Sequence, residues 1–171
     1  QVVVLTDDAH LPASGIPRLI SYEAFIGAEP DAFDWPAFDE NTAAALCYTS
    51  GTTGNPKGVL YSHRSTVLHA LVASALFQHE TTEETVAMTV VPMFHACGWG
   101  WPYCMVMNGT KLVFPGSKMG DGATLAALIR AERVTIAAGV PTIWQALLNH
   151  ARQTGESLAP LQSVSIGGSA T

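Results

Sequence analysis

Short apolar stretches alternate with helical patterns along most of this chain, and this alternation constrains the fold more than any other feature of the sequence. The apolar stretches are typical of strands, and the segments between them repeat their apolar residues at helical spacing. Right-handed crossovers through such helices give a mostly parallel sheet with helices on both faces. We therefore predict an α/β fold whose strands and helices alternate over 86–91, 95–107, 111–114, 124–132, 134–137, 141–150 and 163–166.

The residues before this region predict a more irregular arrangement. The β-branched run at 2–5 is expected to form a strand buried on both faces, and 21–27 a short helix. Prolines, acidic residues and aromatics between 28 and 41 favour a surface connector. A further strand is expected at 43–48.

A long helix is predicted at 63–78, with Ser62 as its N-cap. Apolar residues recur along one stripe of this helix, a pattern typical of a helix that packs against a core. The stripe consists of Val67, Leu68, Leu71, Val72, Ala75 and Leu76.

Composition restricts the class of protein. The chain has 171 residues, 48% hydrophobic and 13% charged, which suffices for one substantial core but not for two. It contains no uncharged apolar run of about eighteen residues, so we expect a soluble protein without a transmembrane segment. The net charge of −6, with scattered basic residues, disfavours nucleic-acid binding.

Three cysteines without a CxxC pair favour a reducing compartment, and we expect a cytoplasmic protein. The sequence begins at Gln1 without an initiator methionine and stops in a glycine-rich turn at 167–171, so we expect an internal piece of a longer protein. Such a piece would expose apolar faces that are normally covered, which favours a homo-oligomer.

The segment 49–58, which follows the strand at 43–48, has a composition suited to phosphate binding. It contains three glycines, three threonines, a serine and a lysine. Glycines let backbone N–H groups approach phosphate oxygens, hydroxyls add donors and can reach Mg²⁺, and Lys57 supplies a positive charge. The segment therefore predicts a polyphosphate-binding loop, and the alternative is a plain polar turn.

This loop differs from the Walker-type loop, G-x-x-x-x-G-K-[ST]. Counted from Gly51, the sixth residue is Pro56 rather than glycine, and Lys57 is followed by Gly58 rather than serine or threonine. A P-loop NTPase is therefore disfavoured.

The run YTSGTTGNPKG at 48–58 resembles the signature loop of the adenylate-forming enzymes, which include acyl- and aryl-CoA ligases, luciferases and amino-acid adenylation domains. The resemblance implies that a carboxylate attacks the α-phosphorus of ATP, giving an acyl-adenylate and pyrophosphate, and that a thiol, usually CoA, then displaces AMP. It implies a place for Thr49 near Mg²⁺. It also implies contacts with the ATP phosphates from Thr49, Ser50, Gly51, Thr52, Thr53, Gly54 and Lys57.

A second run, PMFHACGWGW at 92–101, resembles the family's segment beside the carboxylate substrate. His95 stands where amino-acid adenylation domains usually carry an aspartate, and Met-Phe-His is common there in medium- and long-chain fatty acid ligases. The resemblance thus implies a fatty acid substrate, a catalytic role for His95, and a place for Trp99 at the mouth of the acyl tunnel. The plainer interpretations are a helix-capping His95 and a core Trp99.

The run GGSA at 167–170 resembles the family's loop against which adenine and the acyl group pack. This resemblance implies binding roles for Gly167, Gly168 and Ser169. Without it, two glycines after a strand are ordinary turn residues.

The resemblance covers the chain from Ala43 onward and, weakly, the part before. It implies that 1–171 is part of the large N-terminal domain, with a strand, short helix and connector at 1–41 and the phosphate loop and following α/β units at 42–171. The sequence contains no match to the family's Tyr-Gly-x-Thr-Glu stretch, its ribose-holding aspartate or the lysine of its small C-terminal domain. We therefore expect this chain alone to be inactive.

Two other functions stay open at this point. One is a ligase for an aryl, short-chain or sulfur-containing acid, because the resemblance implies that part of the substrate pocket lies outside this stretch. The other is a noncatalytic nucleotide-binding module.

Overall fold

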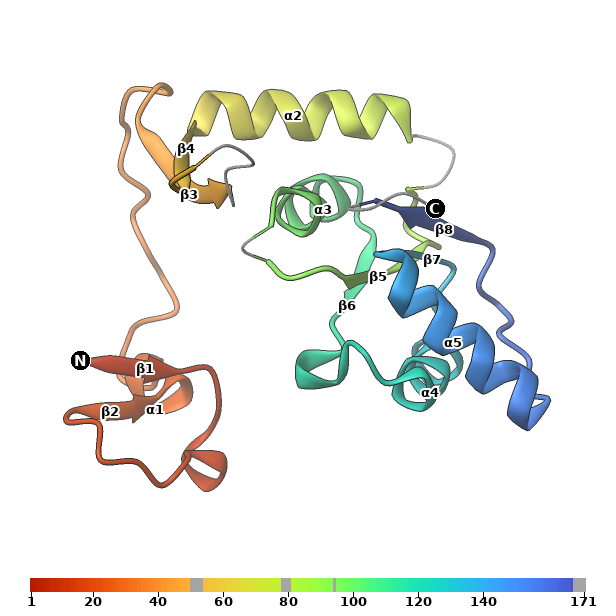
Figure 1. Ribbon diagram of the computed structural model, residues 1–171. Helices are drawn as coiled ribbons and strands as arrows, with labels where there is room; N and C mark the ends of the chain where they lie inside the picture. The colour runs from red at the N-terminus through yellow and green to blue at the C-terminus, as the bar shows by residue number, and fades with distance from the viewer. Residues whose placement is uncertain (50–53, 78–80, 94, 168–171) are drawn as a thin grey trace. The chain divides into compact units, whose positions relative to one another are not determined.

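A computed structural model describes residues 1–49, 54–77, 81–93 and 95–167 (Figure 1). The chain divides into two units, Gln1–Phe38 and Asp39–Thr171. In the first unit, β1 (Val2–Val4) pairs in parallel with β2 (Leu19–Ser21), and a short 3-10 helix, η1 (Asp8–His10), lies between them in the chain.

The predicted short helix is confirmed as α1 (Tyr22–Ile26). The hydroxyl of Ser21 caps it by accepting a hydrogen bond from the N–H of Ala24 at 3.1 Å. The prediction that the first strand is buried on both faces is wrong, since Val2 is 43% exposed and Leu5 86% exposed. The reason is that β1 belongs to a sheet of two strands rather than to the main sheet.

The second unit begins with an antiparallel hairpin of β3 (Ala43–Thr49) and β4 (Lys57–Ser62). Leu46 lies opposite Leu60, and Thr49 lies opposite Lys57. The sequence predicts β3 but not β4, because β4 opens with a lysine and a glycine, which are uncommon in strands.

The long helix is confirmed as α2 (His63–Leu76), with Ser62 as its N-cap. The hydroxyl of Ser62 accepts from the N–H of Ser65 at 3.1 Å, and the Ser65 hydroxyl accepts from the N–H of Ser62 at 3.0 Å. The apolar stripe of this helix is exposed, with Leu76 73% accessible. α2 instead buries small residues, Thr66 and Ala70, on the side that packs against α3 (Ala96–Met107).

The main sheet consists of four parallel strands in the order β6-β5-β7-β8, which confirms the predicted α/β fold. These strands are β5 (Val86–Val90), β6 (Lys111–Val113), β7 (Ile136–Gly139) and β8 (Ser163–Ile166). β7 starts two residues later than predicted. Val134 instead closes the end of the preceding helix by donating its N–H to the carbonyl of Ile129 at 2.9 Å.

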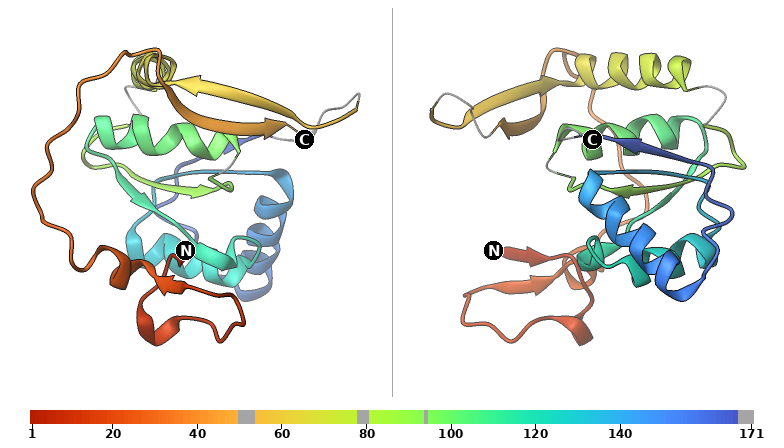
Figure 2. Two further views of the ribbon diagram at one scale, coloured as in Figure 1. Left: turned by 90° about the vertical axis from the view of Figure 1, so that its left-hand side faces the viewer. Right: turned by 45° about the vertical axis from the view of Figure 1, so that its right-hand side comes forward.

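Helices cover both faces of the sheet, as predicted (Figure 2). α3 lies over one face, and α4 (Gly122–Glu132) and α5 (Pro141–Thr154) lie over the other, with a short 3-10 helix, η2 (Gly116–Lys118), before α4. Side chains alternate between the faces along β5, so Ala87 packs with Met105 of α3 and Met88 packs with Leu125 of α4. The larger core is on the α4 and α5 side and comprises Met88, Val90, Val113, Leu125, Ala126, Ile129, Val134, Ala137 and Leu147.

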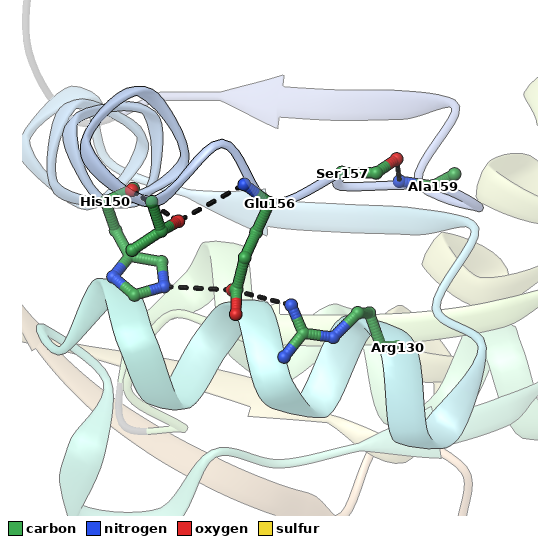
Figure 3. Close-up of polar contacts among 6 residues, drawn as sticks. Arg130, His150, Glu156, Ser157 and Ala159 are labelled. Atoms are coloured by element: carbon green, nitrogen blue, oxygen red, sulfur yellow. Dashed lines mark hydrogen bonds and ion pairs between the residues drawn. The ribbon is translucent and has the colours of Figure 1, made fainter.

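The end of α5 is tied to α4 by a carboxylate (Figure 3). Oε2 of Glu156, just after α5, lies 2.6 Å from Nη1 of Arg130 in α4 and 3.1 Å from Nε2 of His150 in α5. Two hydrogen bonds lower the pKa of Glu156 below its ordinary value of 4.5. The bond from Arg130 has the larger effect and the bond with His150 the smaller one.

Replacing Glu156 with glutamine is expected to lower the melting temperature slightly at neutral pH, because all three side chains of this cluster are partly exposed. Since the pKa of Glu156 is lower in the folded state, its ionised form contributes stability that is complete above 4.5 and is lost as the pH falls through the folded-state pKa. The variant and the natural protein should therefore converge in acid. Melting scans over this range measure the difference, and a gap that persisted at the acidic end would contradict the explanation.

Candidate functional site

The two central strands of the sheet define where a ligand can enter. From β5 the chain passes through α3 to β6 on one side, and from β7 it passes through α5 to β8 on the other. In open parallel sheets, ligands bind beyond the carboxyl ends of strands at such a reversal of strand order. The segments that leave these ends are the ones that start at Val91 and Val140.

A cavity of about 440 Å³ lies at this position, within the size range of small-molecule sites. The strand ends contribute one side of it, while α2 and α3 contribute the other. Most of its wall is apolar. The lining residues are His69 and Ala73 from α2, its C-cap Phe77, Gly100, Trp101, Cys104 and Met105 from α3, and Val91, His95, Ala138, Gly139, Val140, Ser165, Ile166 and Gly167 from the strand ends and the residues that follow.

His95, predicted as a catalytic residue, lines this cavity and is exposed. It lies in a tight turn between β5 and α3, where its N–H donates to the carbonyl of Pro92 at 2.9 Å. Its own carbonyl accepts from the N–H of Gly98 at 2.9 Å. The turn therefore presents the imidazole at the carboxyl end of β5, and its catalytic role stays a prediction.

The other predicted acyl- and adenine-binding residues are placed only in part. Gly167 lines the cavity, and its N–H donates to the carbonyl of Gly139 at 3.4 Å. Trp99 belongs to α3, but its side chain lies outside the description, and Gly168 and Ser169 lie outside the described residues.

The described residues of the predicted phosphate loop belong to the hairpin of β3 and β4 or precede β4. The two ends of the loop are adjacent, because Thr49 faces Lys57 across the ladder and the Thr49 hydroxyl lies 3.5 Å from the carbonyl of Lys57. Gly54 has a φ of 149°, a conformation that glycine adopts readily and other residues rarely do. Ser50, Gly51, Thr52 and Thr53 lie outside the described residues. The hairpin thus places Thr49 and Lys57, two residues of the predicted loop, opposite each other.

Sequence patterns did not reveal the contribution of α2 to the cavity. His69, Ala73 and the C-cap residue Phe77 recur every fourth residue, which places them on one side of α2 and its C-terminal end. That spacing could have identified this face. The stripe of larger apolar residues on another face of α2 gives a stronger helical pattern, however, and it predicts the wrong buried side. Met105 belongs to the core beneath α3 and also lines the cavity.

Within the described part of the chain, no group of histidine, cysteine, aspartate or glutamate side chains is arranged to hold a metal ion. Cys47 and Cys104 are free thiols. No helix among the described residues is both long and apolar enough to cross a membrane.

Together, a parallel sheet with helices on both faces and a cavity at its strand-order reversal define an α/β protein built to bind a small ligand. The family model described as AMP-binding enzyme matches residues 5–171. The chain therefore belongs to the AMP-binding enzyme family.

Known proteins support this assignment. The chain is 51% identical to a medium-chain-fatty-acid–CoA ligase of Ectopseudomonas oleovorans over 155 residues, which are 91% of this chain and 28% of that protein. It is also 51% identical to a 3-methylmercaptopropionyl-CoA ligase of Ruegeria pomeroyi over 158 residues, 92% of this chain and 29% of that protein. The chain thus spans less than a third of the length of these relatives.

The fold agrees with a solved structure, the o-succinylbenzoate coenzyme A synthetase of Bacillus subtilis in complex with ATP and magnesium ion. The TM-score is 0.70 at 23% identity, over 88% of this chain and 30% of that one. This likeness confirms the α/β fold of the chain.

Proposed function

We propose that the protein carrying this chain activates a carboxylic acid with ATP, forming an acyl-adenylate and pyrophosphate, and then transfers the acyl group to the thiol of CoA with release of AMP. We propose a medium- or long-chain fatty acid as the substrate and the cytoplasm as the place of action. In this proposal, residues 1–171 belong to the large N-terminal domain, with the phosphate loop and the α/β units in 42–171.

One observation carries this proposal. The largely apolar cavity at the ends of β5, β7 and β8 lies in a chain that is 51% identical to a medium-chain-fatty-acid–CoA ligase. An apolar wall stabilises a hydrocarbon chain through the hydrophobic effect. The imidazole of His95, at one side of the same cavity, supplies a polar group for the carboxylate end of the acid.

The proposed chemistry divides between the cavity and the hairpin. The carboxylate oxygen of the acid forms a bond to the α-phosphorus of ATP while the bond to the pyrophosphate oxygen breaks. The loop at 49–58, with Lys57 and its hydroxyls and N–H groups, holds the β- and γ-phosphates and stabilises the charge that gathers on the leaving group. Trp99, Gly167, Gly168 and Ser169 are proposed to contact the acyl group or adenine.

The hydroxyl groups of this loop suit magnesium, because Mg²⁺ prefers oxygen ligands such as hydroxyls and the phosphate oxygens of ATP. We propose that the hydroxyl of Thr49, at the end of β3, lies near the ion. When bound with ATP, Mg²⁺ would neutralise part of the phosphate charge.

ATP–pyrophosphate exchange by the intact protein tests this function. With octanoate or palmitate present, we expect labelled pyrophosphate to enter ATP, and we expect AMP release to require CoA as well. The isolated chain of 171 residues is expected to show no exchange. Failure of the intact protein to catalyse exchange with any acid would contradict the proposal.

A sulfur-containing acid is a second candidate, because the Ruegeria pomeroyi relative has the same 51% identity. The exchange assay should therefore include 3-methylmercaptopropionate and benzoate beside the fatty acids. We expect kcat/KM to be highest for octanoate or palmitate. A clear preference for 3-methylmercaptopropionate would retain the reaction and replace the substrate.

A further inference from the structure

His69 of α2 and Gly100 of α3 lie so close together that no side chain fits between them. A Cβ built on Gly100 would be 2.6 Å from Cε1 of His69, 3.3 Å from Nδ1 and 3.5 Å from Nε2. Because glycine has no Cβ, Gly100 lets the imidazole lie against the backbone of α3. All three nearest atoms belong to the ring, so a methyl group at Gly100 would displace the His69 side chain rather than the backbone.

The helix that carries this ring is fixed to α3 by a short chain of hydrogen bonds. The side-chain amide of Asn108, just after α3, donates to the hydroxyl of Ser74 in α2 at 2.8 Å and to the carbonyl of Cys104 at 2.7 Å. The Ser74 hydroxyl donates to the carbonyl of Ala70 at 2.8 Å. These bonds join α2 to α3 at a point within about two turns of His69. A small change at Gly100 is therefore expected to move the His69 ring before it moves the helix.

Both residues line the cavity of about 440 Å³. Along α2, the wall continues from His69 to Ala73 and then to the C-cap residue Phe77 at one-turn spacing. The imidazole is therefore a bulky group in an otherwise mostly apolar wall. Its position therefore affects the free volume of the cavity.

We propose that His69, seated against Gly100, is a specificity-determining residue that limits the length of the acyl chain. This inference rests on the proposed function, because it takes the cavity to be the site of the fatty acid. Removing the ring enlarges the cavity and favours longer acids. A methyl group on Gly100 drives the ring from its place into the open cavity beside it and favours shorter acids.

The test compares kcat/KM for palmitate and octanoate in ATP–pyrophosphate exchange by the intact protein. His69→Ala is expected to raise the palmitate-to-octanoate ratio about tenfold, and Gly100→Ala to lower it by about the same factor. His69→Leu keeps a bulky side chain without the ring nitrogens, so its ratio should stay close to that of the natural protein. In the double variant, Gly100→Ala should have no effect on the ratio beyond that of His69→Ala, because the ring that it displaces is absent.

The controls separate this inference from loss of folding and from the proposed function. Gly120→Ala adds a methyl group where no described atom lies within 4 Å, and it should leave the ratio unchanged. If Gly100→Ala does not fold, the pair His69→Ala and His69→Leu still decides the question. An unchanged ratio in His69→Ala, or an effect of Gly100→Ala that persists without the ring, would overturn the inference alone. Absence of exchange by the natural protein with every acid would overturn it together with the proposed function.

Discussion

Lys57→Ala is expected to slow acid-dependent ATP–pyrophosphate exchange by the intact protein about a hundredfold. Loss of one preorganised donor to developing negative charge has an effect of this order in other enzymes. Lys57 opens β4 directly opposite Thr49, so the ladder fixes its backbone at the root of the proposed phosphate loop. Its side chain is exposed, which leaves the ammonium group accessible to a ligand.

The matched control is Lys118→Ala, which removes an exposed lysine from η2 and should leave exchange unchanged. Circular dichroism of both variants checks that the fold persists. Thr52→Ala should reduce ATP binding in the same direction as Lys57→Ala, because both residues belong to the same proposed loop. Equal exchange rates for the Lys57 and Lys118 variants would remove the proposed role of Lys57.

Gly98→Ala is the second change with a large expected effect. A Cβ on this residue of α3 would lie 2.7 Å from the carbonyl oxygens of both Val91 and Pro92. These are backbone atoms, which cannot rotate away as a side chain can. Alanine in place of glycine within a helix ordinarily stabilises it by up to about 1 kcal/mol. Here overpacking reverses the sign, and we expect a loss of about 1–3 kcal/mol in the free energy of unfolding.

The same substitution is expected to lower activity, because the N–H of Gly98 donates to the carbonyl of His95 and helps to shape the turn that holds this residue. Urea denaturation and pyrophosphate exchange measure the two effects. Gly120→Ala serves as the control, since the added methyl group has open space among the described residues. Equal stability of the two variants would show that α3 shifts freely away from the end of β5.

The main sheet and its helices are predictable from the sequence because local chemistry agrees with the final packing. Ser62 caps α2, Pro141 starts α5 at a position where proline fits, and both helices begin where the sequence indicates. The mostly apolar sequence of β5 likewise agrees with burial on both faces. Helices and strands of this kind can be predicted without knowing which other segments they pack against.

The features that the sequence did not predict depend on how distant segments of the chain pack or pair with one another. Nothing in the sequence of α2 indicates that Ala70, rather than the larger Leu71, faces α3. The proximity of His69 to Gly100 likewise depends on how two helices pack, and those residues are 31 positions apart in the sequence. β4 was missed because pairing with β3, rather than strand propensity, makes it a strand.

The alternation of side chains along β5 has a consequence for how this protein can change. The described residues that line the cavity come from α2, α3 and the strand ends, whereas the larger core lies beneath α4 and α5. Substitutions at distant sites on opposite sides of a sheet tend to combine additively. Substitutions that change the lining of the cavity can therefore accumulate while the larger core on the other face keeps the fold stable. Related chains can thus differ in the ligand that they prefer and still share the same fold.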